Sequence, residues 1–413
     1  MKTYKRILAV MLAVAMMVCV FAACGSNAAS APASSAEAAA SGEAAPAAAA
    51  GDKVVKIGVY EPASGDNGAG GKQETLGMQY ANQETKTVEI GGVEYDVELV
   101  YADNASDNTQ ATSAAQKLVS EGVSVVLGSY GSGVSIAGSE TFKNADTPAI
   151  GVTCTNPQVT AGNSHYFRVC FLDPFQGTVL ANYAFKELGV TTAYCLGELG
   201  NDYDQGLVTY FKQAFEGLGG TVFAESFPKD TQDFTSYLTN AEALNAEVFF
   251  CPVSIDYAVK IIEQASSQGK TFPILGGDTL DSNMVSNAAK GTSVKVVVTT
   301  FYQEGANETF DNGFKAWLAE DAEALTNNGG NDIIAGVTAM GYDAYYVALE
   351  ALKAAGSTEP KAVMEALPAV TYDGVSGHIE FDETGDAVRT TAYVKTVNNE
   401  TGDWEFVTEQ TVG

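Results

Sequence analysis

Short apolar runs rich in β-branched residues alternate with amphipathic helical stretches along residues 54–413. In the first part of this segment the pattern predicts strands at 54–60, 95–103 and 123–129 and helices at 74–84, 108–121 and 134–144. Strands that alternate with helices in this way build parallel sheets covered by helices on both faces. The pattern therefore predicts an α/β fold.

The same alternation restarts after Asp173 and ends in strands that look antiparallel. It predicts helices at 175–188, 204–218, 234–245, 256–268 and 334–355, and strands at 191–197, 221–226, 247–253, 273–277, 294–302, 378–381, 391–397 and 404–407. Roughly 360 residues are too many for one ordinary core, so we expect two doubly wound, Rossmann-like lobes. Ligands of such sheets bind beyond the carboxyl ends of the strands, which two facing lobes would bring to one cleft.

The residues before this segment predict export and a lipid anchor. An apolar run at 7–22 follows three basic residues, as in an export signal. Small residues directly precede Cys24, as at sites where bacteria attach diacylglycerol and cleave; the alternative is a plain secretory signal with an incidental cysteine. Two acyl chains would hold the protein on a membrane. We expect a signal peptide at 1–23 and a lipidated Cys24 that opens an Ala/Ser-rich tether at 24–52.

Charge and cysteine content exclude several classes of protein. The net charge is −29, and such a field repels phosphate backbones and anionic lipid headgroups. We therefore expect no nucleic acid partner and no direct membrane docking by the folded part. The cysteines beyond Cys24 show no C-x-x-C spacing, and the chain has 2 histidines. These features predict no disulfide framework, no metal site and no cofactor.

Enzyme motifs are incomplete wherever they begin. Gly71 and Lys72 would end a phosphate-binding loop, but Asp66 stands at its first glycine and Gln73 at its hydroxyl position. We expect a flexible turn at 65–71 instead. No serine has the glycine pattern of a nucleophile elbow. His165 and His378 are more readily explained as structural residues, so the sequence predicts a protein that is not an enzyme.

One set of segments favours the binding of a zwitterion. The stretch 125–135 runs from a strand through a Gly/Ser turn into a helix, whose free N–H groups can hold a carboxylate. The alternative is an ordinary turn with a serine cap. The next strand ends in Thr153 and Thr155, and a strand of the second lobe ends at Asp278. A carboxylate there suits an ammonium, although a helix N-cap is again the alternative.

These residues lie in a series of motifs that resembles a known family. KIGVYEPASG, LGSYGSG, TCTNPQVT, FRVCFLDPFQG, NDYDQGL, ILGGDTLDS, AMGYDAYYVALEAL and IEFDETGD follow in family order over residues 54–413. In this series the chain is similar to the branched-chain-type amino acid binding proteins of ABC importers, which have the type I periplasmic binding protein fold.

The resemblance implies roles for individual residues. It assigns the ligand carboxylate to the hydroxyls of Ser132 and Thr155, and the ligand ammonium to the carbonyl of Thr153 and the carboxylate of Asp278. Tyr203 corresponds to an aromatic residue that covers the ligand. Both charges of a buried zwitterion need charge-assisted hydrogen bonds, which agrees with these roles.

The chain departs from this family at the side-chain pocket. Gly70 and Val337 fall where relatives for aliphatic ligands often have aromatics, and Tyr130 or Tyr60 would partly refill that space. Gly131, with Ser106, falls where some relatives have a disulfide. Tyr130 and Gly131 are included among the candidate ligand-binding residues.

The resemblance further implies a receptor that closes on an amino acid, branched-chain or related, and delivers it to an ABC permease. It implies a monomer held outside the cytoplasm at the cell membrane. The lobes would comprise 53–172 plus 300–373 and 173–299 plus 374–413, joined by crossovers near 171–173, 298–301 and 372–375. The alternatives are a receptor of the same fold for an amide, urea or another small polar solute, and an extracellular α/β enzyme.

Overall fold

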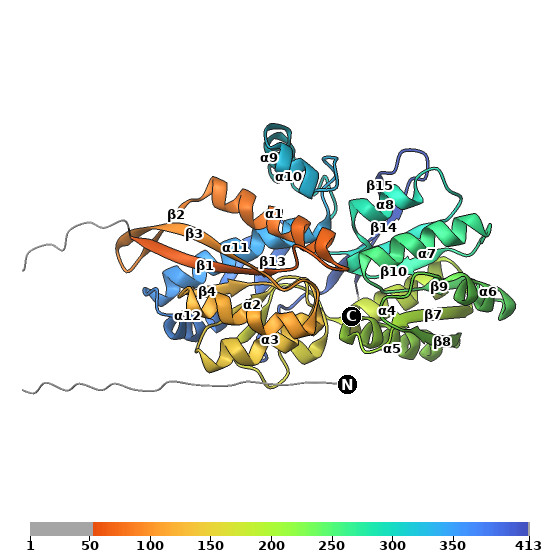
Figure 1. Cartoon of the computed structure of the whole chain (residues 1–413), viewed down its shortest axis with the longest axis horizontal. Coiled ribbons are helices and arrows are strands. Elements are labelled where there is room, and N and C mark those ends of the chain that lie inside the picture. Colours follow the sequence, from red (N-terminus) through yellow and green to blue (C-terminus); the bar gives the residue numbers. More distant parts are fainter. Residues whose placement is uncertain (1–52, 412–413) are drawn as a thin grey trace, which may run out of the picture. The chain divides into compact units, whose positions relative to one another are not determined.

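The structure, a computed structural model, describes residues 53–411 (Figure 1). The predicted signal peptide, the lipidation site at Cys24 and the tether at 24–52 lie outside the described residues. Among the described residues, no helix is both long and apolar enough to cross a membrane.

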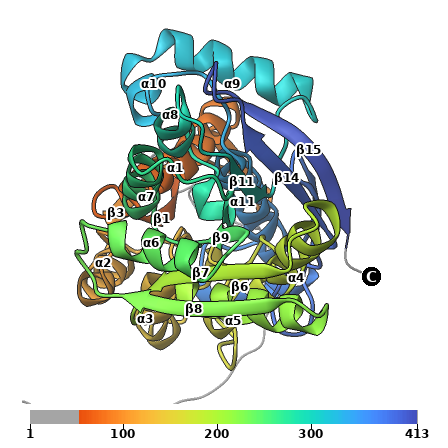
Figure 2. The same ribbon diagram turned by 90° about the vertical axis from the view of Figure 1, so that its right-hand side faces the viewer.

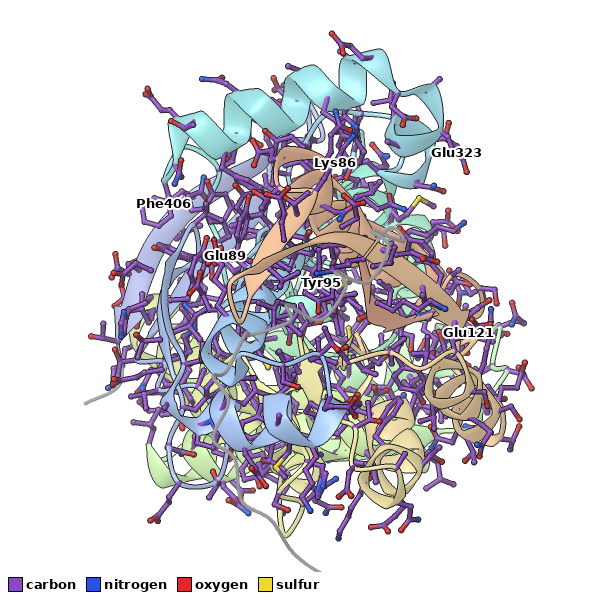
Figure 3. All side chains as sticks on the ribbon, turned by 90° about the vertical axis from the view of Figure 1, so that its left-hand side faces the viewer. Lys86, Glu89, Tyr95, Glu121, Glu323 and Phe406 are labelled. Carbon is purple, nitrogen blue, oxygen red and sulfur yellow. The ribbon has the colours of Figure 1, made fainter. Side chains whose placement is uncertain are left out.

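The first lobe is built on a six-stranded sheet in the order β2-β3-β1-β4-β5-β6. Its strands are β1 (Val54–Glu61), β2 (Thr87–Ile90), β3 (Val93–Asp103), β4 (Val125–Leu127), β5 (Ala149–Gly151) and β6 (Tyr166–Arg168). All neighbours pair in parallel except β2 with β3. The edge strand β2 and its approach place the exposed Lys86 and Glu89 beside the buried Val88 and Ile90 (Figure 3), so charges protect this edge.

The second lobe is built on a seven-stranded sheet in the order β15-β14-β11-β10-β9-β7-β8, which faces the viewer in Figure 2. Its strands are β7 (Thr192–Glu198), β8 (Thr221–Phe227), β9 (Val248–Phe250), β10 (Ile274–Gly276), β11 (Val296–Thr300), β14 (Thr391–Val397) and β15 (Trp404–Thr411). β14 pairs in antiparallel fashion with both β11 and β15, and the other pairs are parallel. A separate antiparallel pair consists of β12 (Thr371–Gly374) and β13 (Gly377–Glu380).

Helices cover both faces of each sheet (Figure 1). They are α1 (Gly68–Glu84), α2 (Asn108–Ser120), α3 (Ser132–Asn144), α4 (Asp173–Asn182), α5 (Asp202–Gly217), α6 (Thr235–Ala243), α7 (Ile255–Ser267), α8 (Asn283–Ala289), α9 (Glu308–Glu320), α10 (Ala322–Asn327), α11 (Gly336–Ala355) and α12 (Pro360–Ala366). Single turns are η1 (Pro157–Val159), η2 (Tyr183–Glu187), η3 (Asp278–Leu280) and η4 (Leu367–Ala369). The α/β fold class and its parallel sheets are confirmed.

Burial on both faces of the sheet explains why β1 is a nearly continuous apolar run. Val55, Ile57 and Val59 join the core that contains Met78 of α1, whereas Tyr60 joins the core of α2 and α3 on the other face. A strand of a parallel sheet is buried on both faces and therefore needs apolar residues at successive positions.

The predicted flexible turn at 65–71 is wrong in its second half, because α1 already begins at Gly68. The glycines there serve close packing instead. A Cβ at Gly71 would lie 2.2 Å from the Pro62 carbonyl oxygen, and one at Gly70 would lie 2.4 Å from Cζ of Tyr130. Such gaps admit no side chain, so the glycines allow the helix to begin against these neighbours.

Candidate functional site

The carboxyl ends of the strands in both sheets border one cleft with a volume of about 230 Å³. Tyr130, Gly131 and Ser132 line it from the first lobe, and Tyr203 and Thr279 line it from the second. The lobes touch directly, since the Tyr130 phenol donates to the Thr279 carbonyl at 3.0 Å. Four of the seven candidate ligand-binding residues therefore line one cleft. Thr153, Thr155 and Asp278 lie fully buried next to it.

The turn between β4 and α3 has the features of an anion-binding helix start. Its N-cap is Gly131, and no side chain caps the helix. The structure thus contradicts the serine-cap alternative. The Ser132 oxygen accepts from the Asn156 N–H at 3.2 Å, which leaves the hydroxyl proton free to be donated. The first N–H groups of α3 and this hydroxyl can together bind a carboxylate.

The two threonines after β5 differ in their contacts. Thr153 donates its hydroxyl to the Glu74 carboxylate. The Thr155 hydroxyl is buried and makes no well-aligned hydrogen bond with the described residues, although it lies close enough to the Asp173 carboxyl group to lower the pKa of that group. An unpaired buried hydroxyl costs free energy unless a ligand pairs with it, so Thr155 is a strong candidate for ligand contact.

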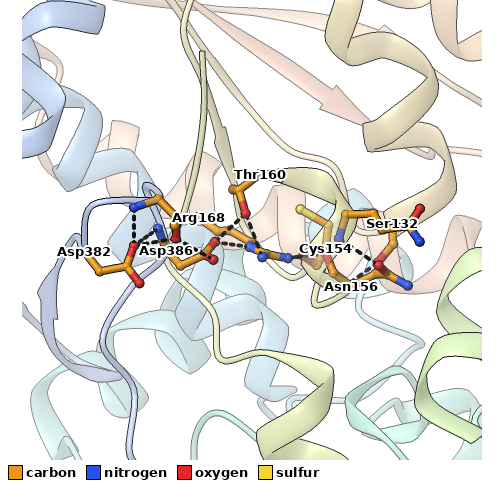
Figure 4. Close-up of polar contacts among 9 residues, drawn as sticks. Ser132, Cys154, Asn156, Thr160, Arg168, Asp382 and Asp386 are labelled. Carbon is orange, nitrogen blue, oxygen red and sulfur yellow. Dashed lines mark hydrogen bonds and ion pairs between the residues drawn. The ribbon is translucent and has the colours of Figure 1, made fainter. Parts of the chain in front are cut away.

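Arg168 at the end of β6 holds the segment that carries Thr155 (Figure 4). Its guanidinium is fully buried, and Nη1 donates to the carbonyl oxygens of Cys154 at 2.8 Å and Asn156 at 2.5 Å. Nε pairs with Asp386 at 2.6 Å, and Nη2 donates to Thr160 at 3.0 Å. Arg168 therefore fixes the backbone on both sides of Thr155.

Asp278 begins η3, where its side chain makes no cap hydrogen bond. The N-cap alternative is thus contradicted as well. Its Oδ1 accepts from Nε2 of Gln176 at 2.6 Å and from the Tyr203 phenol at 2.9 Å. Burial raises the pKa of Asp278 to about 6, although these two hydrogen bonds lower it. The carboxylate is poised to bind a cationic nitrogen, which would restore its full ionisation.

Tyr130 covers the space above Gly70, as the close approach of its ring shows. Tyr60 does not reach that space, because its phenol donates to carbonyl oxygens of Val134 and Ala111 between α2 and α3. Val337 packs in the same apolar cluster as Tyr130. The cleft thus has an aromatic wall that comes from the β4–α3 turn.

Several buried polar residues around the cleft were not evident from the sequence. The sequence places Glu74 at the start of a predicted helix and Glu61 just after a predicted strand, and it assigns no role to either of them or to Gln176 and Arg168. Burial raises the pKa of Asp173, at the start of α4, to about 8. Glu61 and Arg168 carried a signal in the sequence, since each stands directly in a run of apolar strand residues.

The described residues form no metal-binding group. Over residues 53–411, no group of three His, Cys, Asp or Glu side chains could hold a metal ion. The predicted structural histidines lie near the surface, His165 beside Asp146 and His378 beside Asp373. Cys154, Cys170, Cys195 and Cys251 are buried and free.

Comparison with known proteins agrees with this geometry. Residues 54–403 match the family model described as periplasmic binding protein. A Leu/Ile/Val-binding protein homolog 1 from Brucella abortus is 28% identical over 336 residues, which cover 80% of this chain and 87% of the relative.

Two crystal structures are similar over most of the chain. A leucine-binding protein, LivK, from Thermotoga maritima has a TM-score of 0.75 and 31% identity, and the match covers 86% of this chain and 99% of that one. The branched-chain amino acid transporter substrate-binding protein LivJ from Streptococcus pneumoniae, in complex with isoleucine, has a TM-score of 0.75 and 25% identity, with 87% and 99% covered. The chain belongs to the periplasmic binding protein family, as a substrate-binding protein of the ABC transporter type in the group of leucine/isoleucine/valine-binding relatives.

Proposed function

We propose that this protein captures an α-amino acid in the cleft between its lobes and delivers it to an ABC importer. The proposal is carried by two complementary sets of polar groups, one of hydrogen-bond donors and one of acceptors, that face each other. An uncapped helix start with Ser132 and the unpaired Thr155 offers donors, and Asp278 with Tyr203 offers acceptors. A solute with a carboxylate at one end and an ammonium at the other satisfies both.

Each candidate residue has a defined part in this binding. Ser132, Thr155 and the N–H groups that follow Gly131 hold the carboxylate. Asp278 and the Thr153 carbonyl hold the ammonium. Tyr203 keeps its hydrogen bond to Asp278 and covers the ligand together with Tyr130. No covalent chemistry is needed.

The two lobes, with the boundaries 53–172 plus 300–373 and 173–299 plus 374–413, would close by hinge motion at three crossovers. We further propose that the protein acts as a monomer, anchored outside the cytoplasm through a lipidated Cys24 and presented to the permease on its Ala/Ser-rich tether. The family's extracytoplasmic role supports this placement.

Isothermal titration calorimetry of the purified protein against the twenty amino acids, urea, short amides and small organic acids tests the proposal. The variant Asp278→Asn should weaken amino acid binding about 10- to 150-fold, because hydrogen bonds to charged groups contribute about 1.5–3 kcal/mol. Asp96→Asn, an exposed carboxylate on β3, is the matched control and should bind as the parent does. Binding of uncharged amides or urea alone, unaffected by Asp278→Asn, would replace the amino acid by a neutral polar solute.

A further inference from the structure

Two buried carboxyl groups lie beside the candidate site without a role in the proposed zwitterion contacts. Glu61 ends β1, and its Oε2 accepts the Tyr130 N–H at 2.7 Å. Glu74, on α1, accepts the Thr153 hydroxyl. Tyr130 lines the cleft, so Glu61 is one hydrogen bond away from it, and Glu74 is bound to the candidate residue Thr153.

The two carboxyl groups also lie against each other, and no cation of the described chain pairs with either. Glu61 and Glu74 are close enough to share a proton. The fully buried cations bind elsewhere, Arg168 to Asp386 and Lys395 to Asp281. Burial raises the pKa of Glu61 well above its ordinary range, and the neighbouring Glu74 raises it further. Burial also raises the pKa of Glu74 to about 7, so the pair is partly ionised at neutral pH, and no cation of the described residues neutralises that charge.

Around this pair, the buried hydrogen-bond acceptors outnumber the donors that the described residues supply. Oε1 of Glu61 and Oε1 of Glu74 are buried, and apart from the proton that the pair can share, no described residue donates to them. Oε1 of Gln176, an amide that is fully buried and donates to Asp278, likewise receives none. Asp278 also raises the pKa of Glu74 by its charge, which places the two carboxyl groups in one electrostatic cluster. Unpaired buried acceptors require donors, and a solute is the source of donors in a binding cleft.

The pair lies directly behind Tyr130, which lines the cleft. Gly70 offers no side chain, and the Tyr130 ring stands over it. The Tyr130 N–H is the group that binds Glu61, so the turn that forms the aromatic wall also holds a carboxyl group. A purely aliphatic side chain in this direction would leave the pair without a partner at a substantial desolvation cost.

We propose that the solute carries a second cationic nitrogen, as a basic α-amino acid does, and that Glu61 and Glu74 bind it beside Tyr130. This inference rests on the proposed function, since the α-carboxylate and α-ammonium occupy the contacts of Ser132, Thr155 and Asp278. A cation in the solute side chain would favour the ionised form of the pair. The overall charge of −29 also favours the approach of cationic solutes.

L-Lysine and L-norleucine are the decisive pair of probes, because they differ only in the terminal ammonium. Calorimetric titration of the purified protein should show lysine or arginine binding at least about tenfold more tightly than norleucine or leucine. Glu61→Gln and Glu74→Gln should each reduce this preference about tenfold or more while binding of norleucine is retained. Glu94→Gln, an exposed carboxylate on β3, should leave it unchanged.

Each other outcome has a definite meaning. Norleucine or leucine binding as tightly as lysine overturns this inference and leaves the proposed function intact. Lysine binding that neither glutamine variant weakens also overturns it. Failure of every α-amino acid to bind refutes the proposed function itself. If a glutamine variant does not fold, the comparison of lysine with norleucine on the unchanged protein still decides.

Discussion

The substitution Arg168→Met tests how the backbone on both sides of Thr155 is held. It removes a fully buried cation and leaves Asp386 without its partner, and breaking one side of a buried ion pair costs about 3–5 kcal/mol. The carbonyl oxygens of Cys154 and Asn156 also lose their donor, at about 1–3 kcal/mol for each unsatisfied group. Methionine fills part of the volume but restores none of these contacts, so we expect a total loss of at least about 5 kcal/mol in the free energy of unfolding.

The same substitution should weaken ligand binding although Arg168 touches no ligand. Release of the two carbonyls frees Thr155 and the Asn156 N–H, which donates to Ser132. Both proposed carboxylate contacts then lose their fixed position, and we expect affinity to fall about tenfold or more. Arg168→Lys keeps the charge beside Asp386 but lacks the planar fork that reaches both carbonyls. It should therefore recover much of the stability and little of the affinity.

Urea denaturation followed by circular dichroism gives the stability change, and calorimetry gives the affinity change. The control is Lys353→Met, whose salt bridge to Glu350 is 46% and 39% exposed and should contribute less than about 0.5 kcal/mol. A loss below about 1 kcal/mol in Arg168→Met, close to the control, would refute the reasoning. So would an Arg168→Lys variant with parental affinity, since charge alone would then position Thr155.

Three further predictions follow from the same contacts. Amino acid affinity should fall as pH drops below about 6, by up to about tenfold per pH unit. Burial raises the pKa of ligand-free Asp278 to about 6, and the protonated form cannot pair with an ammonium. Calorimetry from pH 7.5 to 4.5 checks this prediction, and an affinity that does not change with pH contradicts it. The ligand-free protein should melt at a higher temperature at pH 5.5 than at pH 8.5. Burial raises the folded-state pKa of Asp173 to about 8 and of Glu74 to about 7. The folded state therefore binds more protons than the unfolded state and loses stability as pH rises from about 4 through these values. A melting temperature, measured by calorimetry, that rises toward pH 8.5 would disprove this. Gly77→Ala should destabilise the protein by about 2 kcal/mol or more, because its Cβ would lie 1.9 Å from the Thr338 carbonyl oxygen of α11. Gly217→Ala in α5, with nothing within 4 Å of the new Cβ, should instead stabilise it by about 0.5–1 kcal/mol, and equal effects in urea titrations would refute the packing argument.

The fold could be predicted from periodicity because the central strands of both sheets are buried on both faces. β1 is an example, since Val55, Ile57 and Val59 face one layer of helices and Tyr60 faces the other. The predicted strand at 247–253 is observed only at Val248–Phe250. The residues that follow such a strand leave the sheet and turn toward the cleft. There they are still buried, but they no longer pair with a neighbouring strand. Apolar runs therefore overestimate strand length at the carboxyl ends.

The candidate site was only partly predictable for a different reason. Ser132, Thr155 and Asp278 follow strands and stand beside glycine or proline, which marks them in the sequence. Glu74 has no such mark, because a glutamate in a helix usually faces water. Its burial depends on α11, which approaches α1 so closely that a Cβ at Gly341 would lie 2.1 Å from the Glu74 carbonyl oxygen. Contacts between segments so distant in sequence are not visible in local patterns.

The buried carboxyl groups link solute binding to the approach of the two lobes. The lobes meet at Tyr130 and Thr279, and in this arrangement Asp278 and Glu74 are shielded from water. Their raised pKa values reflect the free energy that is needed to bury their negative charge. A solute with matching nitrogen cations removes that cost only in this arrangement, because in separated lobes water already solvates the carboxylates. Differential interaction of this kind is what allows a ligand to shift a conformational equilibrium. The acidic residues that select the solute would thus also make closure depend on it, and Asp278→Asn should make the ligand-free lobes associate more readily while the solute binds less tightly.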